Sequence, residues 1–244
     1  MKKQEEYFAS LIALMERVAD TQKAPIEAAV NAIAISLEQG GMIYAFGTGH
    51  SHMLAEELFY RAGGLVSVYP LFDDPLMLHI NATRSSRMEQ LPGYAVTLLE
   101  DGPELKEGDV MLIFSNSGRN AAPIEMAIEA KKRGLTVICI TNLAHSGSVT
   151  SRHPNGKKLY ELSDIVIDNC GVIGDASMEI GEVVTGSTSS AVGTAILQAI
   201  VCGVVEKMQE DGFTPEVFSS SNIDHGAEKN AAYLKKYKKI IPFL

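Results

Sequence analysis

The spacing of apolar residues along the chain changes once, at a pair of glycines. Before that point, apolar positions recur every three or four residues over 4–20, which predicts an amphipathic helix. A second helix is predicted over 25–37, because Gly40 and Gly41 follow it and glycine commonly ends helices. The chain therefore begins with two helices before any strand.

Short apolar runs rich in β-branched residues follow the glycines. They lie at residues 42–46, 65–71, 110–114, 136–140 and 164–169. Helical spacing occurs between several of them, over 51–62 and 121–133, and a long patterned helix follows over 190–210. Strands that are apolar on both faces and alternate with helices are typical of a parallel sheet covered on both sides. The pattern predicts an α/β protein.

The same pattern divides the 244 residues into three parts, a length that suffices for one sizeable core. Residues 1–38 form two helices that pack either on the domain or on a neighbouring subunit. Residues 39–212 form the α/β domain, and residues 213–244 form a C-terminal loop and a short helix. The segment 145–163 is polar and rich in glycine and serine, which predicts a surface loop.

Composition and charge exclude several classes of partner. A net charge of -9 argues against a nucleic-acid surface, because such surfaces need clustered lysine and arginine. Charged residues interrupt the apolar positions of the N-terminal stretch, so neither a signal peptide nor a membrane span is expected there, and the predicted location is cytoplasmic. Cys139, Cys170 and Cys202 lie far apart among apolar neighbours, and we interpret them as buried free thiols.

The stretch YAFGTGHSH, residues 44–52, places two glycines between a predicted strand and a predicted helix. Gly47 and Gly49 suggest a dinucleotide-binding turn, but the third glycine is missing and His52 stands where a small residue is needed. We therefore predict no nicotinamide or other cofactor. The backbone amides at the start of the helix and the hydroxyl of Ser51 suit a phosphate group instead.

Two further turns have the same construction. Ser115, Ser117 and Asn120 follow a predicted strand and open the next helix, and Ser187 and Thr188 precede the long helix. Helix capping explains any one of these turns alone, but loops at the carboxyl ends of a doubly wound sheet converge on one ligand. Because the chain is acidic, we expect hydroxyls and amides rather than a basic cluster to hold that ligand. A small phosphomonoester fits best.

At these residues the chain resembles the sugar isomerase (SIS) family of phosphosugar-binding domains. The resemblance covers roughly residues 35–210 and rests on the motifs GTGHS, SNSG and GSTSSAVGT in this order. It implies a flavodoxin-like three-layer sandwich with a five-stranded parallel sheet. It also implies that Ser51, Ser115, Ser117 and a residue near Asn120 hold the phosphate of a small sugar, and that the chain forms homodimers or homotetramers.

Isomerisation of an aldose phosphate to a ketose phosphate needs a carboxylate or imidazole that reaches two neighbouring carbons. In phosphoheptose isomerases and N-acetylmuramic acid 6-phosphate etherases, a glutamate lies ten residues after the first-turn serine, where this chain has Arg61. Glu57 lies one helical turn earlier and is a candidate base, and an ion pair with Arg61 across that turn is the equal alternative. Glu89 lies near the second acidic residue of the etherases, although a capping box begun by Ser86 explains it as well.

Two later residues complete the catalytic candidates. Glu182 precedes the third turn, and His225 lies in a loop rich in serine and asparagine. Late histidines act as acids or bases in several sugar isomerases, although a lone loop histidine is often structural. His52 and Glu56 have the spacing of a possible metal pair, but no H-E-x-x-H motif or cysteine and histidine cluster supports one, so no metal is predicted.

The sequence thus favours a phosphosugar isomerase that abstracts a proton next to a carbonyl. An amino-sugar 6-phosphate etherase or lyase is the first alternative, because EVVTGSTSSAVGTAI is similar to the third motif of the etherases. A phosphosugar sensor without turnover is the second, favoured by Arg61 at the position of the usual glutamate. Neither nucleic acid nor a membrane is expected as a partner.

Overall fold

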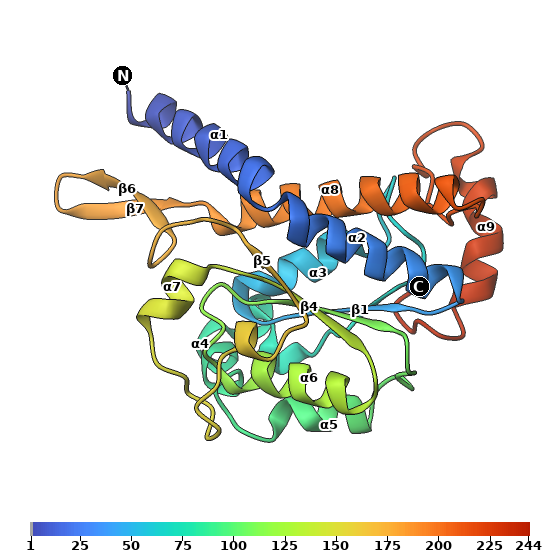
Figure 1. Cartoon of the computed structure of the whole chain (residues 1–244), viewed down its shortest axis with the longest axis horizontal. Coiled ribbons are helices and arrows are strands. Elements are labelled where there is room, and N and C mark those ends of the chain that lie inside the picture. The colour runs from blue at the N-terminus through green and yellow to red at the C-terminus, as the bar shows by residue number, and fades with distance from the viewer. Residues whose placement is uncertain (1) are drawn as a thin grey trace.

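One parallel sheet of five strands organises the molecule (Figure 1). The computed structural model describes residues 2–244. The strands are β1 (Ile43–Gly47), β2 (Val68–Pro70), β3 (Val110–Phe114), β4 (Thr136–Thr141) and β5 (Ile165–Asp168), in the order β2-β1-β3-β4-β5. Each neighbouring pair is parallel. The predicted flavodoxin-like fold is confirmed, and its topological switch point lies between β1 and β3.

Side chains of the strands alternate between two apolar cores, as a sheet covered on both faces requires. Ile43 and Ala45 face one core, which is covered by α2 (Lys23–Glu38), α3 (His52–Leu58) and α8 (Ser189–Glu210). Tyr44 and Phe46 face the other, which is covered by α5 (Tyr94–Glu100), α6 (Ala121–Lys132) and α9 (Gly226–Tyr237). The result is the three-layer arrangement visible in Figure 1, with α2 and α8 on one side of the sheet and α5 and α6 on the other.

Helix α8 is the longest helix of this arrangement. Judged by length and composition alone, it is apolar enough to cross a membrane, and it is the one such helix in the described part of the chain. Core helices share this property, and α8 packs against α2 and α3. Its apolar character is therefore explained by packing in the fold.

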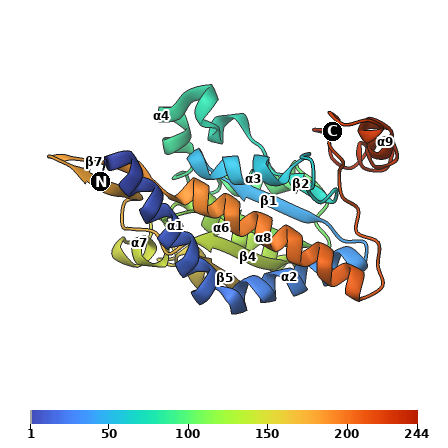
Figure 2. The same ribbon diagram turned by 90° about the horizontal axis from the view of Figure 1, so that it is seen from above.

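A two-stranded hairpin leaves the body of the molecule beside the first helix. Strands β6 (Ala176–Ile180) and β7 (Val183–Ser187) pair antiparallel, and α1 (Lys3–Thr21) lies along them (Figures 1 and 2). The hydroxyl of Tyr7 donates a hydrogen bond of 2.7 Å to the carbonyl of Ser187. The sequence analysis did not predict this hairpin, because its residues were interpreted as a source of acids and as a third turn.

Two predicted segments differ in detail from the structure, and a stretch for which no element was predicted contains helices. The helix expected to reach residue 62 ends at Leu58, because Phe59 is extended and Tyr60 has a φ of 46°. The polar stretch after β2 holds η2 (Asp74–Leu76) and α4 (Leu78–Met88). The expected surface loop at 145–163 overlaps α7 (Leu143–Ser148) and η3 (Leu159–Glu161), which leaves a shorter loop between them.

The three cysteines are free, as predicted, but they are not all buried. Cys139 is buried in β4, and this burial raises the pKa of its thiol to about 12. Cys170 is half-buried and Cys202 is exposed, so the prediction of burial is wrong for Cys202. The helical period explains the error, because α8 turns Val201 and Val204 toward the core and leaves Cys202 on the outer face.

Candidate functional site

The first turn follows β1 at the switch point of the sheet. Gly47 must be glycine, because a Cβ there would lie 2.4 Å from the carbonyl oxygen of Ser51. Gly49 adopts a left-handed conformation with a φ of 57° and begins η1 (Gly49–Ser51). Within the described chain, the amides of Gly49 and His50 donate to no protein acceptor. The turn therefore presents two free donors beside the hydroxyl of Ser51.

The second turn follows β3, the neighbour of β1 in the sheet. The Oγ of Ser115 accepts a hydrogen bond of 3.2 Å from the amide of Gly118, which closes the turn. The amides of Ser117, Arg119 and Asn120 make no hydrogen bond to other residues of the described structure. These donors lie at the start of α6, where the helix dipole adds partial positive charge.

A small hollow of about 30 Å³ lies between the two turns. Its polar lining comes from four segments of the chain and consists of His50, Ser51, Ser115, Asn116, Asn169, Ser189 and Ser190. The Nδ2 of Asn169 donates to the Oδ1 of Asn116 over 2.8 Å, which fixes one wall. Turns that are far apart in the sequence thus border one polar cavity at the carboxyl edge of the sheet.

Only some of the predicted phosphate-binding residues line this hollow. Ser51 and Ser115 line it. Gly49 and Ser117 lie in the same two turns without lining it, and the Oδ1 of Asn120 accepts a hydrogen bond of 2.9 Å from the Nη1 of Arg152. Their part in phosphate binding stays a prediction.

The third predicted turn is occupied by a carboxylate of the chain itself. The Oδ1 of Asp175 accepts hydrogen bonds from the amides of Thr188 and Ser189 at 3.1 and 2.8 Å, and its Oδ2 accepts from the hydroxyl of Ser189 at 2.7 Å. Ser187 is exposed, and Ser189 and Ser190 reach the hollow one turn further along. The sequence analysis did not identify Asp175 as a partner of this helix start, so this cap was missed.

Among the candidate bases, Glu89 is the one that the fold brings to both turns. Its Oε2 accepts a hydrogen bond of 2.6 Å from the hydroxyl of Thr48 in the first turn. Its carbonyl accepts a hydrogen bond of 3.0 Å from the amide of Ala122 at the start of α6. Glu89 is half-buried and follows the last residue of α4.

The other candidate bases have different surroundings. Glu57 forms an ion pair with Arg61 and accepts a hydrogen bond of 3.0 Å from Gln198, as the alternative interpretation expected. Glu182 is exposed at the tip of the β6–β7 hairpin. His225 is exposed and lies 3.0 Å from Glu228 at the start of α9, away from the carboxyl edge. In one copy of the chain, these residues do not meet at the hollow.

The histidines of the first turn have structural partners. His52 is 4% exposed, and its Nδ1 contacts the carbonyl oxygen of Gly49 while its Nε2 lies 3.4 Å from Glu56. His50 is exposed and lines the hollow, which the sequence analysis had not singled out. Over residues 2–244, no group of three or more histidine, cysteine, aspartate or glutamate side chains is placed to hold a metal ion.

Known proteins resemble this chain in sequence and in fold. The sequence matches the family described as SIS domain over residues 6–142. A UPF0309 protein of Listeria innocua is 43% identical over 240 residues, which cover 98% of this chain and 97% of that protein.

Two solved structures share the fold at low sequence identity. A phosphoheptose isomerase from Francisella tularensis is similar with a TM-score of 0.56 and 19% identity, over 84% of this chain and 97% of that chain. The sugar isomerase domain of the transcription factor RpiR from Sphaerobacter thermophilus has a TM-score of 0.51 and 15% identity, over 97% of this chain and 98% of that one.

Proposed function

The chain belongs to the SIS domain family, and we propose that it binds a sugar phosphate at the carboxyl edge of the sheet and interconverts its aldose and ketose forms. One observation carries this proposal. Ser51 and Ser115, from turns on adjacent strands, line a single hollow, and the carboxylate of Glu89 is bonded to the first of these turns. An anion cradle and a proton acceptor are thereby adjacent.

The phosphate is assigned to the two turns that still have free donors. Five backbone amides of these turns donate no hydrogen bond within the described structure. They belong to Gly49 and His50 in the first turn and to Ser117, Arg119 and Asn120 in the second. Groups of this kind at helix starts bind phosphate through hydrogen bonds and the helix dipole. We assign no phosphate contact to the third turn, because its amides already donate hydrogen bonds to the carboxylate of Asp175.

The proton transfer is assigned to Glu89. Its carboxylate takes a proton from the carbon next to the sugar carbonyl and returns it to the former carbonyl carbon. The proton of the adjacent hydroxyl passes to the former carbonyl oxygen, so that an enediol links the two forms and the reaction needs no oxidant or reductant. The Thr48 hydroxyl donates to this carboxylate and orients it. The hollow itself holds only a small group, so the sugar extends outward along the rim, toward Glu89.

The proposal is tested by solvent exchange. Purified protein is incubated in deuterated water with pentose, hexose and heptose phosphates, and deuterium in the recovered sugar is measured by mass spectrometry. We expect incorporation at the carbon next to the carbonyl, together with the isomerised product. An eliminated product would favour the lyase alternative, and neither deuterium nor product with any sugar would overturn the isomerase proposal.

A phosphosugar sensor without turnover is the second candidate, and a specific contact favours it. Glu57, the acid nearest to the position where the enzymes of the family carry their glutamate, is neutralised by Arg61 and bound by Gln198. The likeness to the RpiR sugar isomerase domain extends over nearly the whole chain but concerns the fold alone. Thermal stabilisation by a sugar phosphate without deuterium incorporation would select this candidate.

We further propose that the chain acts in the cytoplasm as a homodimer or homotetramer. The support is the exposure of large apolar side chains on α1 and the β6–β7 hairpin, where Phe8 is 64%, Val183 62% and Val184 58% exposed. Apolar groups concentrated on projecting elements are typical of association surfaces. Sedimentation of the wild type and of a Val184→Lys variant checks this assembly, and a monomeric wild type would overturn it.

A further inference from the structure

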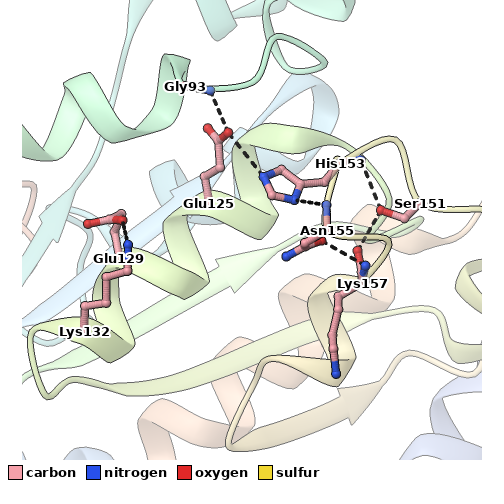
Figure 3. A network of polar contacts seen from close by, with 8 residues as sticks. All are labelled: Gly93, Glu125, Glu129, Lys132, Ser151, His153, Asn155 and Lys157. Carbon is pink, nitrogen blue, oxygen red and sulfur yellow. Dashed lines mark hydrogen bonds and ion pairs between the residues drawn. The ribbon is translucent and has the colours of Figure 1, made fainter.

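Glu125 is a buried carboxylate on α6, one helical turn after the second turn. Its side chain is 7% exposed. Its Oε1 accepts a hydrogen bond of 2.6 Å from the amide of Gly93 and lies 3.5 Å from the Nε2 of His153, while its Oε2 has no partner in the described structure (Figure 3). A buried carboxylate is costly unless it is paired, so this contact to His153 is energetically important.

His153 belongs to a loop, residues 149–158, that is ordered by its own hydrogen bonds (Figure 3). The Nδ1 of His153 accepts from the amide of Asn155 over 3.2 Å, so the proton of the neutral ring is on Nε2 and faces Glu125. The Oγ of Ser151 donates to the carbonyl of Lys157 over 2.7 Å and accepts from the amide of His153 over 3.1 Å. The loop is therefore a preformed unit held against α6.

This loop brings a guanidinium to the phosphate cradle. The amide of Arg152 donates to the carbonyl of Arg119 over 2.8 Å, and its Nη1 donates to the Oδ1 of Asn120 over 2.9 Å. The remaining donors of this guanidinium have no acceptor within the described residues. The sequence analysis expected hydroxyls and amides alone, because residues 115 to 120 and 152 are far apart along the chain.

We propose that Arg152 contacts the phosphate of the bound sugar and that Glu125, acting through His153, is the residue that positions it. This assignment rests on the proposed sugar phosphate site and adds the positively charged side chain of Arg152 to it. A guanidinium offers paired donors that match the oxygens and the negative charge of a phosphate dianion, whereas a neutral sugar has no charge for the guanidinium to pair with. Glu125 also accepts the amide of Gly93, which lies four residues after Glu89 along the chain.

The test measures how far the unfolding temperature of the full chain rises with increasing inorganic phosphate or glucose 6-phosphate, which gives a dissociation constant for each. Glucose, which has no phosphate, is the negative control. Arg152→Gln is expected to raise the dissociation constant for both phosphates by about 10- to 100-fold. Arg152→Lys keeps the positive charge but lacks the paired N–H donors of the guanidinium, so its dissociation constant should lie between those of the wild type and Arg152→Gln. Lys157→Gln removes the same charge from the same loop and should change the constant less than twofold.

A double-mutant cycle tests the positioning role. Glu125→Gln should weaken phosphate binding several-fold in the wild type and have no further effect in the Arg152→Gln background, since it acts through Arg152. Additive losses would overturn the positioning role, because general loosening of the fold would weaken both backgrounds alike. A wild type that no phosphate stabilises overturns the proposed function and this assignment together, whereas a wild-type response that Arg152→Gln retains overturns the assignment alone.

Discussion

The two edges of the sheet differ in an instructive way. At the amino edge, a crevice of about 700 Å³ lies beside α9, and at the carboxyl edge the hollow measures only about 30 Å³. Several polar groups of the crevice already bind one another. The hydroxyl of Tyr237 lies 2.6 Å from both Ser67 and Glu216, and Lys236 lies 2.9 Å from Glu216.

The first two turns beside the small hollow keep amides without acceptors in the described structure, whereas Tyr237, Glu216 and Lys236 of the large crevice bind one another. The binding free energy of a ligand is most favourable where donors are preformed and unpaired, because no hydrogen bond within the protein has to be broken first. Volume alone would therefore select the wrong edge. The following predictions set the two edges against each other.

The largest expected effect is on turnover at the carboxyl edge. Glu89→Gln should lower the isomerisation rate by roughly 10²- to 10⁴-fold, because the amide cannot accept the proton. Phosphate-dependent stabilisation should stay close to that of the wild type. Glu104→Gln, which removes an acid from the rim of the amino-edge crevice, is the matched control and should leave the rate within twofold.

The next effect concerns the backbone of the first turn. A methyl group in Gly47→Ala would lie 2.4 Å from the carbonyl of Ser51, so the turn must shift. We expect a loss of about 1–3 kcal/mol in the free energy of unfolding and a large loss of phosphate binding. Urea unfolding and phosphate titration measure both. Gly147→Ala, where the added methyl meets nothing within 4 Å, should change neither, and equal behaviour of the two variants would contradict the account.

A smaller effect is expected at the start of α8. Asp175→Asn removes the charge that accepts the amides of Thr188 and Ser189, and this should cost about 1 kcal/mol of stability. Thermal unfolding measures the loss. If a phosphate bound at this helix start, the variant would bind phosphate more tightly, and such a gain would contradict the assignment of the phosphate to the first two turns.

The smallest effect belongs to the amino edge and appears at alkaline pH. Burial raises the pKa of Tyr44 above its ordinary 10.0, and burial together with Glu216 raises the pKa of Tyr237. Above pH 10 the unfolded chain releases these protons while the folded chain keeps them, so the free energy of unfolding falls as pH rises. Below pH 10 the contribution is fully present.

Denaturant unfolding at several alkaline pH values measures this slope. Tyr237→Phe removes one of the groups that titrate, so its stability should decline less steeply above pH 10 than that of the wild type. Phosphate binding at the carboxyl edge should not change. An unaltered slope would show that Tyr237 keeps an ordinary pKa in the folded protein.

Local patterns in the sequence predicted the sheet well. Each strand was found within a few residues, because runs that are apolar on both faces have few alternatives. The first two turns were also predictable, since a strand, small polar residues and a helix follow one another within a dozen positions. Glu57 with Arg61 shows the same principle, because their pairing depends on one helical turn alone.

The parts that could not be predicted depend on contacts between distant segments. Asp175 reaches Thr188 only because a hairpin folds back, and the hairpin pattern was masked by its resemblance to a third turn. Arg152 reaches Asn120 through a loop without any periodic signal. The bond between Glu89 and Thr48 likewise joins residues 41 positions apart. No spacing rule along a single sequence reports such pairs.

The placement of Asp175 links the projecting β6–β7 hairpin to the polar hollow at the carboxyl edge. Strand β6 begins at the very next residue, and Ser189, which Asp175 holds by amide and hydroxyl, forms part of the wall of the hollow. A change in the position of the hairpin is therefore expected to move Asp175 and, with it, Ser189 in that wall.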